Sequence, residues 1–294
     1  MSHHGAVLVG LGNYHQGVPE LDWGAREARA RKLPLHVLRA YHLSEATMPW
    51  ASTVDRAIVD DLRHAAQRHL DHALHHLHEH WGDVPATGAI EDGLPWQVLI
   101  DHSAEAAVTV LGSRQLGAIG AALLGSVSTV VAASAAGPVV VVGHPSGIPA
   151  EYPEVVVGVD GRDQTDEVLG FAFDHASRHR RPLHAIFCWT PDVLATAQWR
   201  NPHPAPERAE RWLSEVLAGW REKYPDVEVR RGVVRDHPVS ALVAAASGQD
   251  LLVVGSHSRH ARISALLGSV SQGVLHHATC PVAVVHPRVA TTTN

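Results

Sequence analysis

The sequence is poor in cysteine and has no long apolar run. Only two of its 294 residues are cysteines, Cys188 and Cys280, too few and too unpatterned for a disulfide framework or a zinc site. The longest apolar stretch, residues 127–142, is interrupted by serine, glycine and proline and is too short to span a bilayer. The first five residues lack the basic and apolar segments of a signal peptide. We therefore expect a cytoplasmic protein without a membrane partner.

Positive charge is also scarce, because the formal net charge is −6 with the histidines neutral. That balance gives no general attraction to nucleic acid or to an anionic membrane. The 24 histidines would add positive charge near pH 6. With this net charge, nucleic acid is not an expected partner.

The length suggests two domains, and 45% hydrophobic residues are enough for two sizeable cores.

Short aliphatic runs alternate with amphipathic segments along the whole chain. In the first half we expect strands at 6–10, 35–41, 86–91, 107–111 and 139–142, and helices at 21–32, 58–81, 94–104 and 127–136. In the second half we expect strands at 154–159, 182–189, 227–232, 251–254 and 282–285, and helices at 166–179, 207–223, 238–246 and 270–277. Segments 44–53 and 190–206 are expected loops. This alternation predicts an α/β fold with open parallel sheets, helices on both faces and ligands outside the strand carboxyl ends.

The two halves are a tandem duplication. Pro95 and Pro238 correspond, as do Gly112 and Gly255, and each pair is 143 positions apart (238 − 95 = 143; 255 − 112 = 143). We expect one repeat over residues 1–145 and a second over 153–288, joined by a linker near residues 144–153.

A glycine motif recurs at the same place in both repeats. Gly112 is followed by Gly125-Ser126, and Gly255 by Gly268-Ser269, with the same spacing in each copy (125 − 112 = 13; 268 − 255 = 13). Each copy is predicted to be a strand end, a loop and a Gly-Ser step into a helix. Backbone N–H groups at such a helix N-terminus bind phosphate.

Other nucleotide motifs fail at a decisive residue. The Gly10-Leu11-Gly12 start of a dinucleotide fingerprint has His15 where the third glycine belongs, so a Rossmann NAD site is not expected. The glycine spacing of a P-loop ends at Ser126, where the phosphate-binding lysine should be. No nucleophile–base pair has a recognisable spacing. We therefore assign no catalytic residue and do not expect an enzyme, although weak hydrolytic activity stays open.

A row of histidines follows one predicted helix. His72, His76 and His80 are spaced four residues apart and share a helix face. Such a row can bind a transition metal. Because the row lies away from the apolar stripe and has no converging carboxylate in the sequence, we predict a solvated face and no metal site. Asp22 and the other carboxylates are likewise interpreted as solvated surface.

Together, these motifs resemble the universal stress protein family in its tandem two-domain form, over residues 5–143 and 153–287. The resemblance implies two parallel five-stranded sheets of the adenine nucleotide alpha hydrolase type, with strand order 3-2-1-4-5. It also implies ATP binding at the strand carboxyl ends, with or without Mg²⁺, in a stress-response regulator that is non-catalytic or weakly catalytic.

The resemblance also assigns site residues. Asp160 matches the aspartate that contacts the ribose and base region, Cys188 borders the adenine, and the glycine motif holds the phosphates. The implied second-repeat set is Gly158, Val159, Asp160, Cys188, Gly255, His257, Ser258, Gly268, Ser269, Val270 and Ser271. The implied first-repeat set is Gly10, Gly12, Ala40, Gly112, Arg114, Gly117, Gly125, Ser126, Val127 and Ser128.

Three positions depart from the family motif. The family motif has a second glycine three positions after the first, and Gln115 and Ser258 stand at that position in the two repeats. Gly12 replaces the aspartate in the first repeat. Arg259 and Arg262 offer charge-assisted phosphate contacts that would offset Ser258. The departures leave a second hypothesis open, a nucleotide-free scaffold that works through protein–protein contacts.

The last strand of each repeat bears on assembly. Residues 139–142 and 282–285 are apolar, and at a sheet edge they would expose unpaired N–H and C=O groups. We expect these edges to be covered, either by the other repeat in a monomeric pseudo-dimer or by a second copy of the chain.

Overall fold

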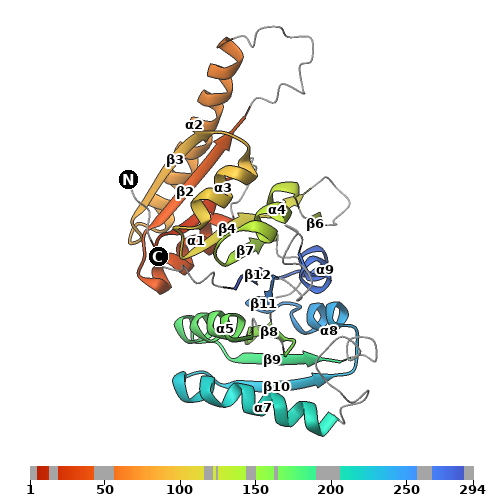
Figure 1. Ribbon diagram of the computed structural model, residues 1–294. Helices are drawn as coiled ribbons and strands as arrows, with labels where there is room; N and C mark the ends of the chain where they lie inside the picture. The colour runs from red at the N-terminus through yellow and green to blue at the C-terminus, as the bar shows by residue number, and fades with distance from the viewer. Residues whose placement is uncertain are drawn as a thin grey trace, which may run out of the picture. The chain divides into compact units, whose positions relative to one another are not determined.

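The computed structural model describes residues 5–12, 19–42, 56–115, 122–123, 125–143, 150–161, 165–189, 206–256 and 267–287. The chain divides into two compact units (Figure 1). Unit 1 comprises Met1–Gly112 and Gly125–Val142, and unit 2 comprises Ser113–Leu124 and Gly143–Asn294.

Unit 1 contains a parallel sheet with the order β3-β2-β1-β4-β7. Its strands are β1 (Val7–Gly10), β2 (Leu35–Tyr41), β3 (Ala86–Asp92), β4 (Val108–Gly112) and β7 (Val139–Val142). Its helices are α1 (Pro19–Arg31), α2 (Arg56–His80), α3 (Pro95–Ser103) and α4 (Ser126–Ser134). Because β7 is its fifth strand, the predicted order 3-2-1-4-5 is confirmed for this unit.

Unit 2 repeats the same topology, β10-β9-β8-β11-β12, again with parallel pairing. Its strands are β8 (Val155–Val159), β9 (Leu183–Cys188), β10 (Val229–Val234), β11 (Leu251–Gly255) and β12 (Val282–Val285). Its helices are α5 (Thr165–His179), α7 (Pro206–Lys223), α8 (Pro238–Ala245) and α9 (Ser269–His277). A short antiparallel hairpin, β5 (Arg114–Gln115) and β6 (Ala122–Leu123), also belongs to this unit and was not expected from the sequence.

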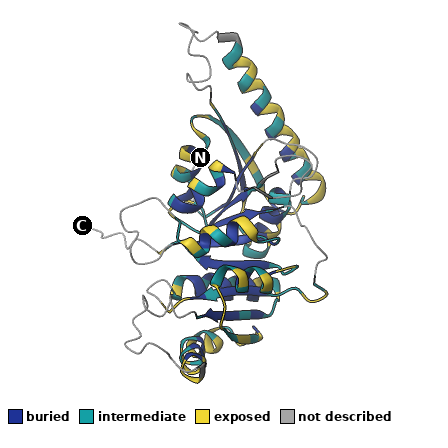
Figure 2. Ribbon diagram, turned by 90° about the vertical axis from the view of Figure 1, so that its right-hand side faces the viewer, coloured by how far each residue is buried: buried dark blue, intermediate teal, exposed yellow. Residues whose placement is uncertain are grey.

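The cores lie on both faces of the central strands. All residues of β1, β7 and β12 are buried, and so are all but one residue of β4, β8 and β11 (Figure 2). Strands covered on both faces appear in the sequence as continuous aliphatic runs, which explains why these strands were recognisable. The outermost strands β3 and β10 are only partly buried, as expected where one side of the sheet ends.

Helix α2 packs through the predicted apolar stripe. Leu70, Ala73 and Leu77 are buried, and a Cβ placed on Gly88 of β3 would lie 2.5 Å from Cδ1 of Leu70. Glycine at position 88 therefore lets the helix approach the strand closely. The helix ends at His80, just before Gly82, as the sequence indicated.

The histidine face of α2 is not uniformly solvated, which corrects the sequence interpretation. Nε2 of His76 lies 2.7 Å from Oδ1 of Asp22 in α1, and the indole Nε1 of Trp81 donates to the same oxygen at 2.9 Å. His72 and His80 remain exposed. Asp22 therefore ties α1 to the end of α2, a contact that sequence spacing could not reveal.

The expected loops at 44–53 and 190–205 and most of the expected linker lie outside the described residues. Within the described part of the chain, no helix combines the length and the apolarity needed to cross a membrane.

Candidate functional site

The site begins where β8 of unit 2 ends. Gly158 and Val159 close the strand, and Asp160 follows on an exposed turn. A Cβ placed on Gly158 would lie 2.9 Å from Cδ1 of Leu242, so the absence of a side chain lets α8 pack against the strand. In this topology β8 and β11 flank the point where the strand order reverses, and ligands bind in the crevice outside that point.

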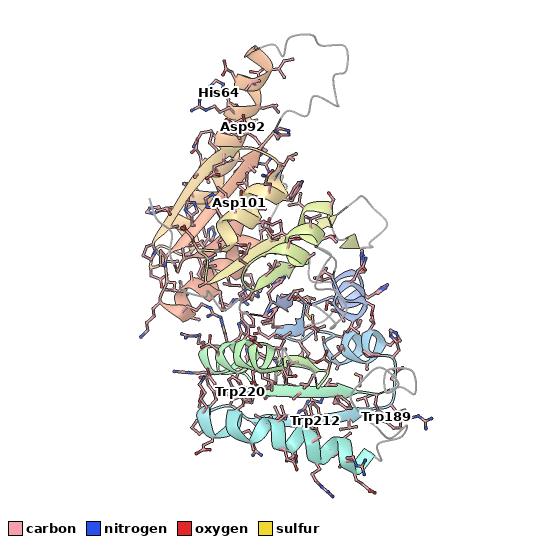
Figure 3. All side chains as sticks on the ribbon, viewed as in Figure 1. His64, Asp92, Asp101, Trp189, Trp212 and Trp220 are labelled. Carbon is pink, nitrogen blue, oxygen red and sulfur yellow. The ribbon has the colours of Figure 1, made fainter. Side chains whose placement is uncertain are left out.

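Gly161 fixes the turn that carries Asp160. Its φ of +70° is in the left-handed region that favours glycine, and a Cβ there would lie 3.2 Å from Cζ2 of Trp212. Trp212 lies on α7 (Figure 3). Its ring also contacts Phe187 of β9, with ring centroids 5.2 Å apart. Trp212 of α7 therefore packs against the turn that carries Asp160, a contact that no sequence motif predicted.

The carboxyl end of β9 provides a second, mostly apolar part of the site. Cys188 is its last residue and is buried. The next residue, Trp189, donates its backbone N–H to the Val234 carbonyl at 3.0 Å, and the Arg235 guanidinium lies 5.2 Å from the Trp189 ring centroid. Asp160, Cys188 and Trp189 thus sit at the ends of two neighbouring strands, because β8 pairs with β9.

The glycine motif of unit 2 connects the end of β11 to the start of α9. Gly255 ends the strand, and its carbonyl accepts a hydrogen bond from the Ser271 hydroxyl. The backbone N–H of Gly268 donates to the Ser256 carbonyl at 2.9 Å. Gly268 is the N-cap of α9 and has no side chain to cap the helix, while Ser269 is exposed. The first-turn N–H groups have no acceptor within the helix, so this end suits an anion.

Unit 1 keeps the same frame. The Ser128 hydroxyl donates to the Gly112 carbonyl at 3.0 Å, and Gly125 caps α4 as Gly268 caps α9. In both units the second serine of the motif is buried and ties the helix start to the strand end. The hydroxyl proton of this serine is therefore already used in a hydrogen bond within the protein. Only the lone pairs of the hydroxyl oxygen could accept a hydrogen bond from a ligand.

The strand ends of unit 1 differ from those of unit 2. Gly12 is exposed, and among the described residues no atom beyond its chain neighbours lies within 4 Å of a Cβ placed on it. The Arg39 guanidinium donates from Nη1 to the Leu11 carbonyl at 2.9 Å, and burial lowers the pKa of Arg39. Position 12 of unit 1 thus carries no carboxylate, and the Arg39 guanidinium lies beside Leu11. Ala40 is buried at the end of β2, as Cys188 is in β9.

Comparison with known proteins identifies the family. The model of the universal stress protein family matches residues 5–143 and 151–286. The chain belongs to the universal stress protein family. The two matches confirm the tandem resemblance.

Related universal stress proteins cover almost the whole chain. One from Mycolicibacterium smegmatis is 36% identical over 296 residues, covering 96% of this chain and 97% of the relative. One from Mycobacterium tuberculosis is 34% identical over 295 residues, covering 96% of each. The crystal structure of a universal stress protein from Archaeoglobus fulgidus has the same fold, with a TM-score of 0.72 at 19% identity, over 97% of this chain and 98% of that one.

Several expected site residues of this universal stress protein lie outside the described residues, namely Gly117, His257 and Ser258. Arg114 lies in β5, where the structure describes the backbone alone. The others are brought to the strand carboxyl ends or the helix starts of their own unit. The first-unit members are Gly10, Gly12, Ala40, Gly112, Gly125, Ser126, Val127 and Ser128, and the second-unit members are Gly158, Val159, Asp160, Cys188, Gly255, Gly268, Ser269, Val270 and Ser271.

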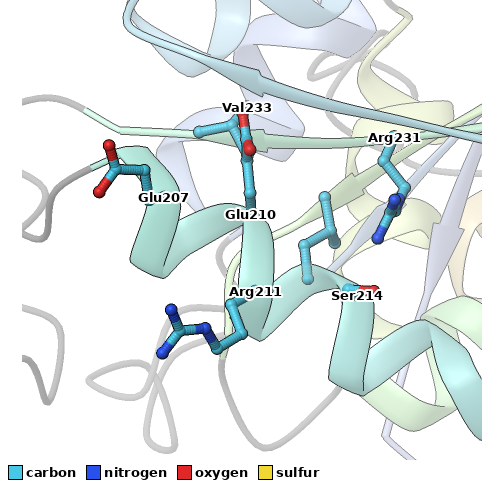
Figure 4. A pocket seen from close by; sticks show the side chains of 7 residues that line it. Glu207, Glu210, Arg211, Ser214, Arg231 and Val233 are labelled. Atoms are coloured by element: carbon cyan, nitrogen blue, oxygen red, sulfur yellow. The ribbon is translucent and has the colours of Figure 1, made fainter.

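A separate open groove lies between α7 and the outermost strand β10 (Figure 4). It measures about 520 Å³, and its lining residues are Glu207, Glu210, Arg211, Leu213, Ser214, Arg231 and Val233. None of these belongs to the strand-end set. Two acids and two arginines balance its charge, so the groove offers no preference for an anionic ligand.

The cysteines of this universal stress protein are expected to be unreactive. Burial, with a smaller effect from the negative charge of Asp236, raises the pKa of Cys188 to about 11, and burial raises the pKa of Cys280 to about 12. Because the thiolate is the nucleophile, we expect alkylation of Cys188 by iodoacetamide at pH 8 to be about 100-fold slower than that of an ordinary thiol. Mass spectrometry of alkylated protein measures this rate.

A urea-unfolded sample provides the control, since both thiols should then react at the ordinary rate. Below the raised pKa, the rate in the native protein should increase about tenfold per pH unit. Rapid alkylation of native Cys188 at pH 8 would contradict the buried position of this thiol.

Proposed function

We propose that this universal stress protein binds an adenine nucleotide, ATP with or without Mg²⁺, in its second repeat. The observation that carries the proposal is the position of Asp160 and of the glycine motif on two adjacent strands. Asp160 follows β8 and Gly255 ends β11, and these strands pair with each other on either side of the strand-order reversal. A ligand in that crevice therefore meets a carboxylate on one side and a helix N-terminus on the other.

Each part of the crevice suits one part of a nucleotide. The Asp160 carboxylate can accept hydrogen bonds from ribose hydroxyls, since an ionised carboxylate acts only as an acceptor. The Gly268-Ser269 start of α9 offers backbone N–H groups to the phosphates. Cys188 adds a small apolar surface at the end of β9 for the base. The apolar surface, the carboxylate and the helix start thus match the base, the ribose and the phosphates of a nucleotide.

The proposed role is binding rather than chemistry. The chain would act as a stress-response regulator in the cytoplasm, whose nucleotide occupancy is sensed by protein partners. Catalysis is left out of the proposal because the sequence offers no nucleophile–base pair that would activate water. Whether the apolar last strands pair within one chain or between two copies stays a prediction, which light scattering would decide.

Gently purified protein tests the proposal. On denaturation it should release an adenine nucleotide, identified by chromatography and mass spectrometry, at up to one per chain. A protein that releases none, and then takes up none when incubated with ATP and Mg²⁺, would contradict the proposal. Protein purified after extensive dialysis provides the control for loosely bound nucleotide.

A scaffold function is the second candidate, and the first repeat favours it. Gly12 leaves that repeat without the carboxylate that Asp160 supplies in the second. A scaffold that needs no nucleotide would bind partners equally well in the presence and absence of ATP, whereas a nucleotide-dependent regulator would not.

A further inference from the structure

A carboxylate lies against the first glycine of the unit 1 motif. A Cβ placed on Gly112 would lie 3.0 Å from Cδ and Oε1 of Glu20 and 3.1 Å from its Oε2. Glu20 is in the first turn of α1 and is partly buried. The Glu20 carboxylate therefore occupies the space that a side chain at position 112 would need, beside the residue whose carbonyl is tied to Ser128 at the start of α4.

Strand register shows which residue of unit 2 occupies the same position. Val7 pairs with Leu35 in unit 1 and Val155 with Leu183 in unit 2, an offset of 148 (155 − 7 = 148; 183 − 35 = 148). The left-handed residue that follows the first helix has the same offset, Lys32 in unit 1 and Arg180 in unit 2 (180 − 32 = 148). The first strand and helix of each unit are therefore equivalent at this offset.

At that offset Glu20 corresponds to Val168, and Gly12 to Asp160 (168 − 20 = 148; 160 − 12 = 148). Val168 is 4% exposed and belongs to the apolar core of unit 2. The two units thus carry their carboxylates at opposite sides of the strand-order reversal. Unit 2 has one after its first strand, where a ribose would lie, and unit 1 has one against the glycine motif, where phosphate would lie.

We propose that Glu20 is a specificity-determining residue that excludes phosphate from the first repeat, so that each chain binds a single nucleotide in the second. An anion at the start of α4 would meet the field of the Glu20 carboxylate across Gly112, and like charges in a partly buried crevice repel strongly. The Ser128 hydroxyl joins the start of α4 to Gly112, the residue beside which the Glu20 carboxylate lies. This inference rests on the proposed nucleotide site of unit 2.

Calorimetric titration of the full chain with ATP and Mg²⁺ tests the inference. Glu20→Gln removes the charge and keeps the shape, and Glu20→Val copies unit 2. Both variants should bind a second nucleotide, with at least tenfold higher affinity at the first repeat than the wild-type protein. Glu79→Gln removes an exposed glutamate from α2 of the same unit and should leave the number of sites at one. Circular dichroism confirms that each variant is folded.

The outcomes separate this inference from the proposed function. One site in wild type and one in both Glu20 variants would overturn the role of Glu20 and leave the unit 2 site standing. No site in wild type but one in the variants would support the role of Glu20 and contradict the unit 2 site. Two sites in wild type, or none in any protein, would overturn the role of Glu20.

Discussion

Asp160→Ala is expected to weaken ATP binding by about 10- to 100-fold with at most a small loss of thermal stability. A hydrogen bond to a charged group contributes about 1.5–3 kcal/mol, and this variant removes the carboxylate that we propose binds the ribose. Asp160 is on an exposed turn, so its removal creates no cavity. Titration calorimetry gives the dissociation constant, and differential scanning calorimetry gives the midpoint temperature.

Asp101→Ala provides the matched control, because Asp101 is an exposed carboxylate on α3 of the other unit. It should leave ATP affinity unchanged. Asp160→Asn should fall between wild type and Asp160→Ala, since the amide keeps one acceptor oxygen and loses the charge. Wild-type affinity in Asp160→Ala would show that the nucleotide does not contact this turn.

Gly161→Val is expected to lower both stability and nucleotide affinity. A β-branched residue at a φ of +70° costs about 1–2 kcal/mol in backbone strain. The added atoms would also press on the Trp212 ring, which lies 3.2 Å from a Cβ at this position, and crowding of this kind typically costs about 1–3 kcal/mol. We expect a total loss of about 2–5 kcal/mol, measured by urea unfolding, and a displaced Asp160.

Two alanine substitutions, Gly161→Ala and Gly219→Ala, test whether the Asp160 turn requires glycine. Gly219 lies in α7, and no atom of the other described residues that could crowd it lies within 4 Å of a Cβ placed there. Alanine at this position should therefore stabilise the protein by about 0.5–1 kcal/mol through helix propensity. Gly161→Ala should instead destabilise the protein by about 1 kcal/mol or more, because the positive φ at position 161 and the nearby Trp212 ring both disfavour a side chain. Equal effects of the two substitutions would show that the Asp160 turn does not require glycine.

The fold was predictable because its signals are local. Four-residue runs such as Val139–Val142 and Val282–Val285 are buried on both faces, so their composition alone marks them as parallel strands. The hairpin of β5 and β6 was missed because two-residue strands leave no periodicity to detect. The strand order itself came from the family resemblance, since the sequence pattern does not specify which strands are neighbours.

The candidate site was predictable only where a motif or the family resemblance carried it. The glycine motif is readable from its spacing, and Asp160 was assigned by the resemblance. In hindsight the hydroxyl that closes the motif is also readable from spacing, because Ser128 and Ser271 both follow their glycine by 16 positions (128 − 112 = 16; 271 − 255 = 16). Trp212 and Glu20 were missed for a different reason. Each contacts a residue far away in the chain, Gly161 and Gly112, and nothing local marks such contacts.

Calorimetric titration of the wild-type, nucleotide-free chain with ATP and Mg²⁺ tests the central claim most directly. We predict one saturable site per chain, which Asp160→Ala weakens and Asp101→Ala does not. The absence of saturable binding would contradict the claim that the second repeat is a nucleotide site.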